Sequence, residues 1–224
     1  MKKLTKILAA IMLMCATMFV AGCEREDDIE PMPISQPPQS DWVDLGLPSG
    51  LLWASRNVGA NTQEQYGDYY AWGETQPKTE YIWITYRFCL NGDYHHLTKY
   101  CRFLTDTVTV LRPEDDAATA NWGGGARIPT KAEWKELVAY TTCCEAYRNE
   151  VRGILYTGSN GNSIFLPNAG YRRGLQIYEG FKYWSSSLNV EDFDYLTACG
   201  FGGGGIWNEN RCLGLPVRAV RSAR

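Results

Sequence analysis

The sequence predicts an α+β domain over residues 41–224, in which short antiparallel strands and irregular loops dominate. Helical signals occur near residues 113 and 130, whereas short apolar segments bounded by glycine, proline and asparagine recur along the domain. A chain with 22 Gly, 8 Trp and 14 Tyr is typical of long loops pinned by large rings. Few helices together with many short strands favour an α+β fold.

The first elements are expected directly after residue 41. Residues 42–58 combine short apolar pieces with Gly46, Pro48 and Gly50, which predicts a strand, a turn at residues 48–50 and a second strand. Residues 66–74, with the sequence YGDYYAWGE, are expected to form an aromatic loop. Residues 75–112 show no clear period, so we expect irregular structure with short strands or turns.

Two short helices are expected next. Pro113 and the three carboxylates after it suit the first turn of a helix, because they complement its dipole, and residues 121–125 end it. Thr130 and Glu133 form a capping box that starts the second helix. A buried stripe at helical spacing follows, formed by Trp134, Leu137 and Val138.

The remaining strands are expected in the second half of the domain. Residues 154–157 and 163–166 flank the dipeptide Asn160-Gly161, which predicts a hairpin. Further strands are expected at residues 183–187, 195–201 and 216–221. Alternation places Cys199 and Phe201 on one face of their strand, and we expect that face to point inward.

Residues 1–22 have the features of an export signal. Lys2, Lys3 and Lys6 precede an apolar stretch, and small residues lead to Cys23. This end of the stretch resembles a bacterial lipobox, which implies cleavage before Cys23 and a diacylglycerol anchor, with palmitate chains, on its thiol. The alternative is a single transmembrane anchor, which needs about 20 apolar residues, more than this stretch has.

Residues 23–40 are expected to form a disordered tether, rich in acidic residues and proline. The sequence EREDDIEPMPISQPPQS holds almost nothing apolar, so it cannot bury enough surface to fold, and its prolines favour an extended chain. Acidic residues directly after the cysteine resemble the export signal of surface lipoproteins of Bacteroidetes, which implies an outer-membrane protein displayed on the cell surface. The alternative is an ordinary solvated spacer on the periplasmic face.

Charge and cysteine content narrow the classes of partner. Removal of the signal leaves 19 of the 22 basic residues against 25 acidic ones, a net charge near −6 without a basic run, so we expect no nucleic-acid partner. The spacing of the domain cysteines does not specify which of them pair. Disulfides and free buried thiols therefore both remain open. With no CxxC pair and only His95 and His96, we expect no metal and no cofactor. The cysteines are Cys89, Cys101, Cys143, Cys144, Cys199 and Cys212.

Five blocks of the domain, in this order, resemble one known family. They are VDLGLPSGLLWA at residues 43–54, YGDYYAWGE at 66–74, RIPTKAEW at 127–134, FLPNAGYR at 165–172 and YWSSS at 183–187, closed by VRAVR at 217–221. The chain is similar to the Fibrobacter succinogenes major paralogous domain and its relatives among Bacteroides lipoproteins. The resemblance covers nearly all of residues 41–224.

The resemblance implies a C-type lectin-like fold, related to formylglycine-generating enzymes, with twisted antiparallel sheets and two helices that support long irregular loops. An enzyme of the formylglycine type needs a close cysteine pair near the C-terminus, whereas Cys199 and Cys212 are far apart in sequence. A calcium-dependent lectin needs a first acidic motif to complement residues 207–210, and the chain lacks it. We therefore expect a non-catalytic domain.

The segment between the last two blocks, residues 188–216, is the expected ligand face. In relatives this stretch is rich in Asn, Ser and Tyr, and in some proteins of the fold a retroelement rewrites it. Amides and carboxylates suit sugar hydroxyls, and Tyr and Trp suit sugar or protein surfaces. The alternative is a solvated loop with Trp207 in the core. The expected ligand-binding residues are Asn189, Asp192, Asp194, Tyr195, Trp207, Asn208, Glu209 and Asn210.

These expectations combine into a surface-anchored lipoprotein that recognises an extracellular glycan or protein through its C-terminal lectin-like face. A ligand-binding protein diversified by a retroelement is a special case of this function. The alternative is a structural or accessory component of a fimbrial or envelope assembly. An enzyme of the formylglycine type ranks third, because its cysteine pair is missing.

Overall fold

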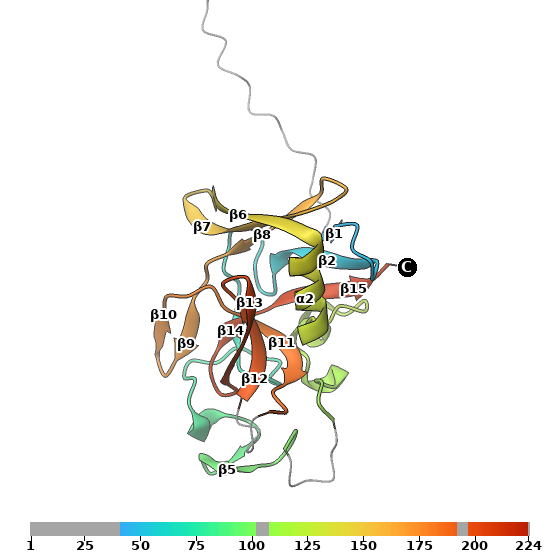
Figure 1. The fold of residues 1–224 in the computed structure, drawn as a ribbon. Coiled ribbons are helices and arrows are strands. Elements are labelled where there is room, and N and C mark those ends of the chain that lie inside the picture. The colour runs from blue at the N-terminus through green and yellow to red at the C-terminus, as the bar shows by residue number, and fades with distance from the viewer. Residues whose placement is uncertain (1–40, 102–107, 192–196, 224) are drawn as a thin grey trace, which may run out of the picture. The chain divides into compact units, whose positions relative to one another are not determined.

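The computed structural model describes residues 41–101, 108–191 and 197–223, all of them within the unit Gln39–Arg224. Their regular structure consists of six small antiparallel sheets, each of two or three strands, and two α-helices (Figure 1). The expected α+β class is confirmed, with antiparallel strands in the majority. Cys23 and the tether at residues 23–40 lie outside the described residues. Within the described ranges, no helix has the length and apolar character needed to cross a bilayer.

A three-stranded sheet brings the two ends of the domain together. It has the order β1-β2-β15, with β1 at Trp42–Asp44, β2 at Leu51–Asn57 and β15 at Arg218–Ser222. The expected first hairpin is confirmed, and its turn is closed by a bond of 2.9 Å from Gly50 N to Leu47 O. The last expected strand is divided into β14 (Leu215–Pro216) and β15, because β14 pairs with β3 (Tyr69–Tyr70) instead of with β2.

Helix α2 spans Lys131–Tyr140 and starts at the expected capping box. Thr130 Oγ1 accepts a bond of 3.3 Å from Glu133 N, and Glu133 Oε2 accepts one of 2.7 Å from Thr130 N. Trp134 and Leu137 are fully buried, whereas Val138 is half-buried at the edge of the stripe.

The helix expected from Pro113 onward begins later than predicted. Pro113–Asp115 form a 3₁₀ turn, and helix α1 spans only Ala117–Trp122. The extended backbone of Asp116 separates the two, and its carboxylate caps α1 by accepting from Thr119 N at 3.0 Å. The same carboxylate accepts from Ile128 N at 2.8 Å, so the start of α1 is fixed to the segment before α2.

A second sheet has the order β6-β7-β8, with strands at Thr141–Arg148, Val151–Gly158 and Ser163–Pro167. The hairpin expected around Asn160-Gly161 is confirmed as β7 and β8. Strand β6 was not expected, because the sequence TTCCEAYR has no apolar alternation. It lies at the edge of the sheet with most of its side chains in solvent, so burial imposes no pattern on it.

The third sheet has the order β11-β12-β13, with strands at Tyr183–Leu188, Thr197–Gly202 and Gly205–Asn210. The expectation that the Cys199 and Phe201 face of β12 points inward is confirmed, and the opposite face is buried as well, since Ala198 is buried as fully as Phe201. Ala198 belongs to a core cluster with Trp184, and Phe201 to a second one with Trp134. The sheet therefore separates two cores, and α2 covers the side of Phe201 (Figure 1).

The remaining elements are short and belong to irregular stretches. Buried Arg211 holds one of these stretches, residues 75–101, because its guanidinium donates to Tyr100 O and to the Tyr86 hydroxyl, each at 3.0 Å. The elements are the 3₁₀ turn at Trp83–Thr85, β4 (Cys89–Leu90), β5 (Asp93–Leu97), β9 (Tyr171–Arg173) and β10 (Gln176–Tyr178).

Candidate functional site

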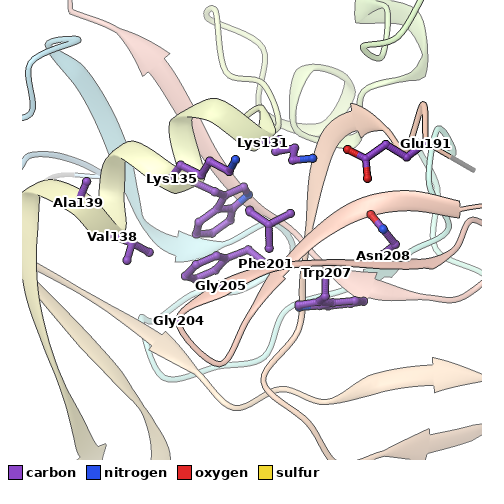
Figure 2. A pocket seen from close by; sticks show the side chains of 12 residues that line it. Lys131, Lys135, Val138, Ala139, Glu191, Phe201, Gly204, Gly205, Trp207 and Asn208 are labelled. Atoms are coloured by element: carbon purple, nitrogen blue, oxygen red, sulfur yellow. The ribbon is translucent and has the colours of Figure 1, made fainter.

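A cavity of about 500 Å³ lies between helix α2 and the β12–β13 hairpin (Figure 2). Its position follows from the third sheet, because α2 packs against the same face of β12 and β13 that carries Phe201. The sequence segment that was expected to bind ligand thus forms one wall, and α2 forms the other. The cavity is lined by Lys131, Trp134, Lys135, Val138, Ala139, Glu191, Phe201, Gly204, Gly205, Ile206, Trp207 and Asn208.

The base of the cavity is a stacked pair of aromatic rings. The rings of Trp134 and Phe201 are nearly parallel, at 8°, with centroids 4.3 Å apart. Trp134 Nε1 also donates to Trp184 O at 3.2 Å, which fixes the indole. Both rings are fully buried, so they stiffen the base, and the apolar contact open to a ligand comes from Val138 and Ile206.

Glycine forms the turn at the end of the hairpin wall. Gly203 and Gly204 have φ values of 58° and 82°, in the left-handed region that other residues adopt at a cost. Because Gly202 pairs with Gly205, the turn has two residues, both with positive φ, as a type I′ turn requires. The four consecutive glycines at residues 202–205 therefore close a hairpin, and no strand pattern after them in the sequence predicted it.

Charged groups line the cavity on both walls. Lys131 and Lys135 lie one turn apart on α2, and Glu191 and Asn208 lie opposite them (Figure 2). The start of α2 is tied to the sheet, since Lys131 N donates to Ser187 Oγ at 3.0 Å. The two lysines were not among the residues expected from sequence. Their spacing after the capping box was visible, but their proximity to β13 is a tertiary contact.

The expected residues of β13 divide between two faces of the sheet. Asn208 pairs with Cys199 and Trp207 with Gly200, so alternation places Asn208 and Asn210 on the α2 side and Trp207 and Glu209 on the other. Figure 2 shows the Trp207 ring on the far side of β13 from the lysines of α2. One ligand in the cavity can therefore meet the side chain of Asn208, and Asn210 lies further along the same face outside the lining.

Trp207 makes packing contacts on its own side of the sheet. A Cβ placed on Gly200 would lie 2.9 Å from the Trp207 ring, so the ring rests directly against β12. Lys182 Nζ lies 4.6 Å from the centroid of that ring and 4.1 Å from that of Tyr171, and it pairs with Glu209 at 2.6 Å. These contacts make Trp207 and Glu209 part of a packed cation and aromatic cluster.

Asn189 has a local role at the end of β11. It is 7% exposed, its Nδ2 donates to Thr197 Oγ1 at 2.9 Å, and its Oδ1 accepts from Glu191 N at 3.3 Å. The side chain therefore shapes the turn that presents Glu191 to the cavity. Asp192, Asp194 and Tyr195 lie outside the described residues.

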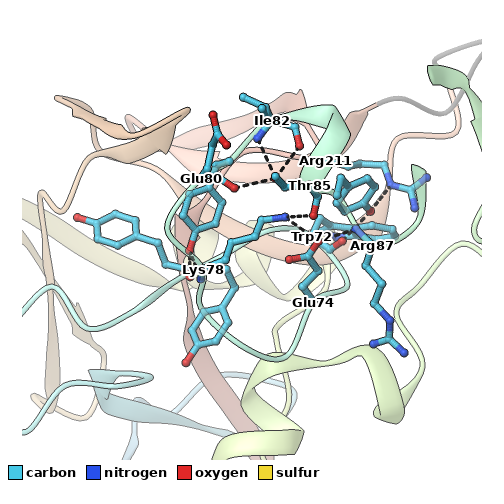
Figure 3. A network of polar contacts seen from close by, with 12 residues as sticks. Trp72, Glu74, Lys78, Glu80, Ile82, Thr85, Arg87 and Arg211 are labelled. Atoms are coloured by element: carbon cyan, nitrogen blue, oxygen red, sulfur yellow. Dashed lines mark hydrogen bonds and ion pairs between the residues drawn. The ribbon is translucent and has the colours of Figure 1, made fainter. Parts of the chain in front are cut away.

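A second polar cluster lies in the irregular region and holds loops together (Figure 3). Lys78 Nζ donates to Glu74 Oε1 at 2.8 Å and to Thr85 O at 2.9 Å. Arg87 N donates to the same Glu74 oxygen at 2.8 Å. Because these groups already have partners within the fold, we assign the cluster to the scaffold.

The cysteines in the described part of the chain are free thiols. Burial raises the pKa of Cys199, and it raises the pKa of Cys212 to about 12, so both stay protonated at neutral pH. Within the described residues, no group of three or more His, Cys, Asp and Glu side chains could hold a metal ion. His96 instead contacts Asp93, with Nδ1 and Oδ2 2.6 Å apart in an exposed hairpin.

The cavity can bind a small ligand or a side chain of a partner. It combines apolar walls with charged and amide groups that converge from two elements, which is the usual composition of binding sites. Comparisons with protein-family models, curated proteins and solved structures found no match to this chain.

Proposed function

We propose that the chain is a surface-anchored lipoprotein whose domain binds a glycan or protein ligand in the cavity between α2 and the β12–β13 hairpin. The observation that carries this proposal is the cavity itself, about 500 Å³ in volume and lined by polar groups from two elements. Sugars offer hydroxyl groups to amides and carboxylates and apolar ring faces to aliphatic side chains. Asn208, Glu191 and Ile206 supply these three kinds of contact.

The proposal includes a C-type lectin-like fold of the Fibrobacter succinogenes major paralogous domain type. Two α-helices, small antiparallel sheets and the long irregular region at residues 75–101 support it. The blocks quoted from the sequence include buried scaffold residues, such as Trp53 in β2 and Trp184 in β11. The ligand face of this fold lies on the C-terminal strands, where β13 forms one wall of the cavity.

The proposed anchor is a lipid on Cys23, which places the domain at the outer membrane and on the cell surface. Labelling cells with a palmitate analogue tests the anchor, because the wild-type chain should take up label and Cys23→Ser should not. Protease added to intact cells tests the display. Loss of the domain supports the cell surface, whereas its protection supports the periplasmic face.

A binding screen tests the ligand proposal. The full chain, purified in detergent, is applied to arrays of glycans and extracellular proteins. Asn208→Ala should weaken binding about tenfold, because it removes one or two hydrogen bonds to the ligand. The matched control is Asn210→Ala, on the same strand face but outside the lining, and it should bind as the wild type does. Equal binding by both variants would place the site elsewhere.

A second candidate function is an accessory role in a fimbrial or envelope assembly, and strand β6 favours it. This strand has eight residues at the edge of its sheet, and Tyr147 on it is 64% exposed. An exposed edge strand can pair with a strand of another chain. Capture of a stable protein partner that is lost in Glu145→Pro, together with no array hits on sugars, would favour this function, because the Glu145 N–H points away from β7 to the free edge and proline removes it.

A further inference from the structure

Two lysines of the cavity stand apart from the other described lysines in their surroundings. Lys78, Lys99 and Lys182 each pair with a carboxylate. The side-chain ammonium groups of Lys131 and Lys135 have no hydrogen bond or ion pair in the described part of the chain. The described lysines whose ammonium groups have no partner are therefore the two that line the cavity.

The position of these two lysines concentrates positive charge. They lie four residues apart on α2, which puts their side chains one above the other, and like charges at this spacing repel each other. Lys131 is the first residue of the helix, where the positive end of the helix dipole adds to its field. Glu191 is the acidic residue of the lining, on the opposite wall. The α2 wall therefore favours an anionic group.

We propose that the cavity takes an anionic saccharide residue, whose carboxylate or sulfate group lies between the ammonium groups of Lys131 and Lys135. The proposal rests on the binding function proposed above. The opposite wall suits the rest of such a ligand, since Glu191 and the Asn208 amide face the cavity and bond hydroxyl groups. Ile206 and Val138 offer apolar contact to the sugar ring.

Binding of three matched sugars to the full chain tests the proposal. D-glucuronate carries a carboxylate, D-glucose 6-sulfate carries a sulfate, and D-glucose carries neither. Titration calorimetry in detergent at low salt should give at least one anionic sugar an affinity about tenfold or more above that of glucose. The two anionic sugars also show which anion the site binds. A carboxylate site prefers glucuronate, and a sulfate site prefers the sulfated sugar.

Lys131→Gln and Lys135→Gln locate the effect. Each should reduce the affinity for the anionic sugar about tenfold, and the double variant should bind it no better than glucose. Glutamine is almost as good a helix former as lysine, and no described side-chain contact is lost. The free energy of unfolding should therefore be unchanged or slightly higher. Arg173→Gln is the control, because it removes one charge from an exposed residue outside the cavity lining.

The outcomes separate this inference from the proposed function. Equal affinity for all three sugars, no binding of either anionic sugar, or unchanged binding by the double variant would each overturn the inference. The proposed function would still stand if an array ligand is lost in Asn208→Ala. It would fail with the inference if Asn208→Ala has no effect on any ligand.

Discussion

Arg218 is fully buried, and its guanidinium group joins two strands that are far apart in the sequence. Nε donates to Asn57 Oδ1 at 2.9 Å, and the two terminal nitrogens donate to Ala54 O at 3.0 Å and Phe165 O at 2.9 Å. Burial lowers its pKa, because the charged form loses hydration. Within the described residues no carboxylate pairs with it, so the three oxygen acceptors and the neighbouring Tyr183 hydroxyl group offset the desolvation.

Replacing Arg218 by Ala should destabilise the domain by about 3 kcal/mol or more, because three buried acceptors lose their donors and a large cavity remains. Urea unfolding of the full chain measures the change. The control is Arg173→Ala at the exposed end of strand β9, which should stay within about 0.5 kcal/mol of the wild type. A similar small effect at Arg218 would show that its bonds do not hold β2 and β8 together.

At the scale of elements, the β12–β13 hairpin depends on glycine for close packing. A Cβ on Gly202 would lie 2.1 Å from Phe181 O and 2.6 Å from Trp207 Nε1, whereas a Cβ on Gly205 would meet nothing within 4 Å. The two glycines pair with each other across the turn, so they form a matched test of the packing of this wall.

Gly202→Ala should destabilise the domain by about 2 kcal/mol, since backbone atoms and the Trp207 ring must move apart. Gly205→Ala should be nearly neutral, within about 0.5 kcal/mol. Thermal unfolding of both variants checks the difference. Equal melting temperatures would mean that the hairpin adapts without strain.

Local signals predicted several elements correctly, and long-range contacts explain what was missed. The capping box at Thr130 and the turn at Asn160-Gly161 are encoded within a few residues, and both are confirmed. Strand β6 carries no burial pattern, because it lies on an exposed edge. The prediction that a helix starts at Pro113 was wrong, because the Asp116 carboxylate accepts a bond from Ile128 N, twelve residues further on.

The candidate site was predictable only on one wall. The C-terminal segment was expected to bind ligand, and Asn208 from it lines the cavity. Which side of β13 each residue faces depends on strand register, and register placed the Trp207 ring against Gly200 of β12, on the other side of the sheet from Asn208. Lys131 and Lys135 could not be linked to the segment, because α2 and β13 meet only through tertiary packing.

At the scale of the whole molecule, buried tyrosines make the stability depend on alkaline pH. Burial raises the pKa of Tyr183 from 10.0 to about 12, although the nearby Arg218 charge lowers it. Burial also raises the pKa values of Tyr69, Tyr70, Tyr81, Tyr86, Tyr100 and Tyr156. The folded state therefore keeps these protons at a pH where the unfolded chain has lost them.

Stability from these tyrosines should be fully present below pH 10 and should fall as pH rises from about 10 through 12. A shift of two pKa units, as for Tyr183, corresponds to about 3 kcal/mol. Urea unfolding at pH 8, 10 and 11, with tyrosinate absorbance at 295 nm, measures both effects. Ionisation of every tyrosine near pH 10 in the folded protein, without loss of stability from pH 8 to 11, would contradict the assignment.

The most direct test of the binding cavity is to fill it. Ala139 lines the cavity on α2, whereas Ala132 is exposed on the same helix outside the lining, so Ala139→Trp and Ala132→Trp add the same ring at different places. The measurement is array binding by the full chain and both variants. If the cavity binds the ligand, Ala139→Trp loses the hits and Ala132→Trp keeps them. Unchanged hits with Ala139→Trp would contradict the account.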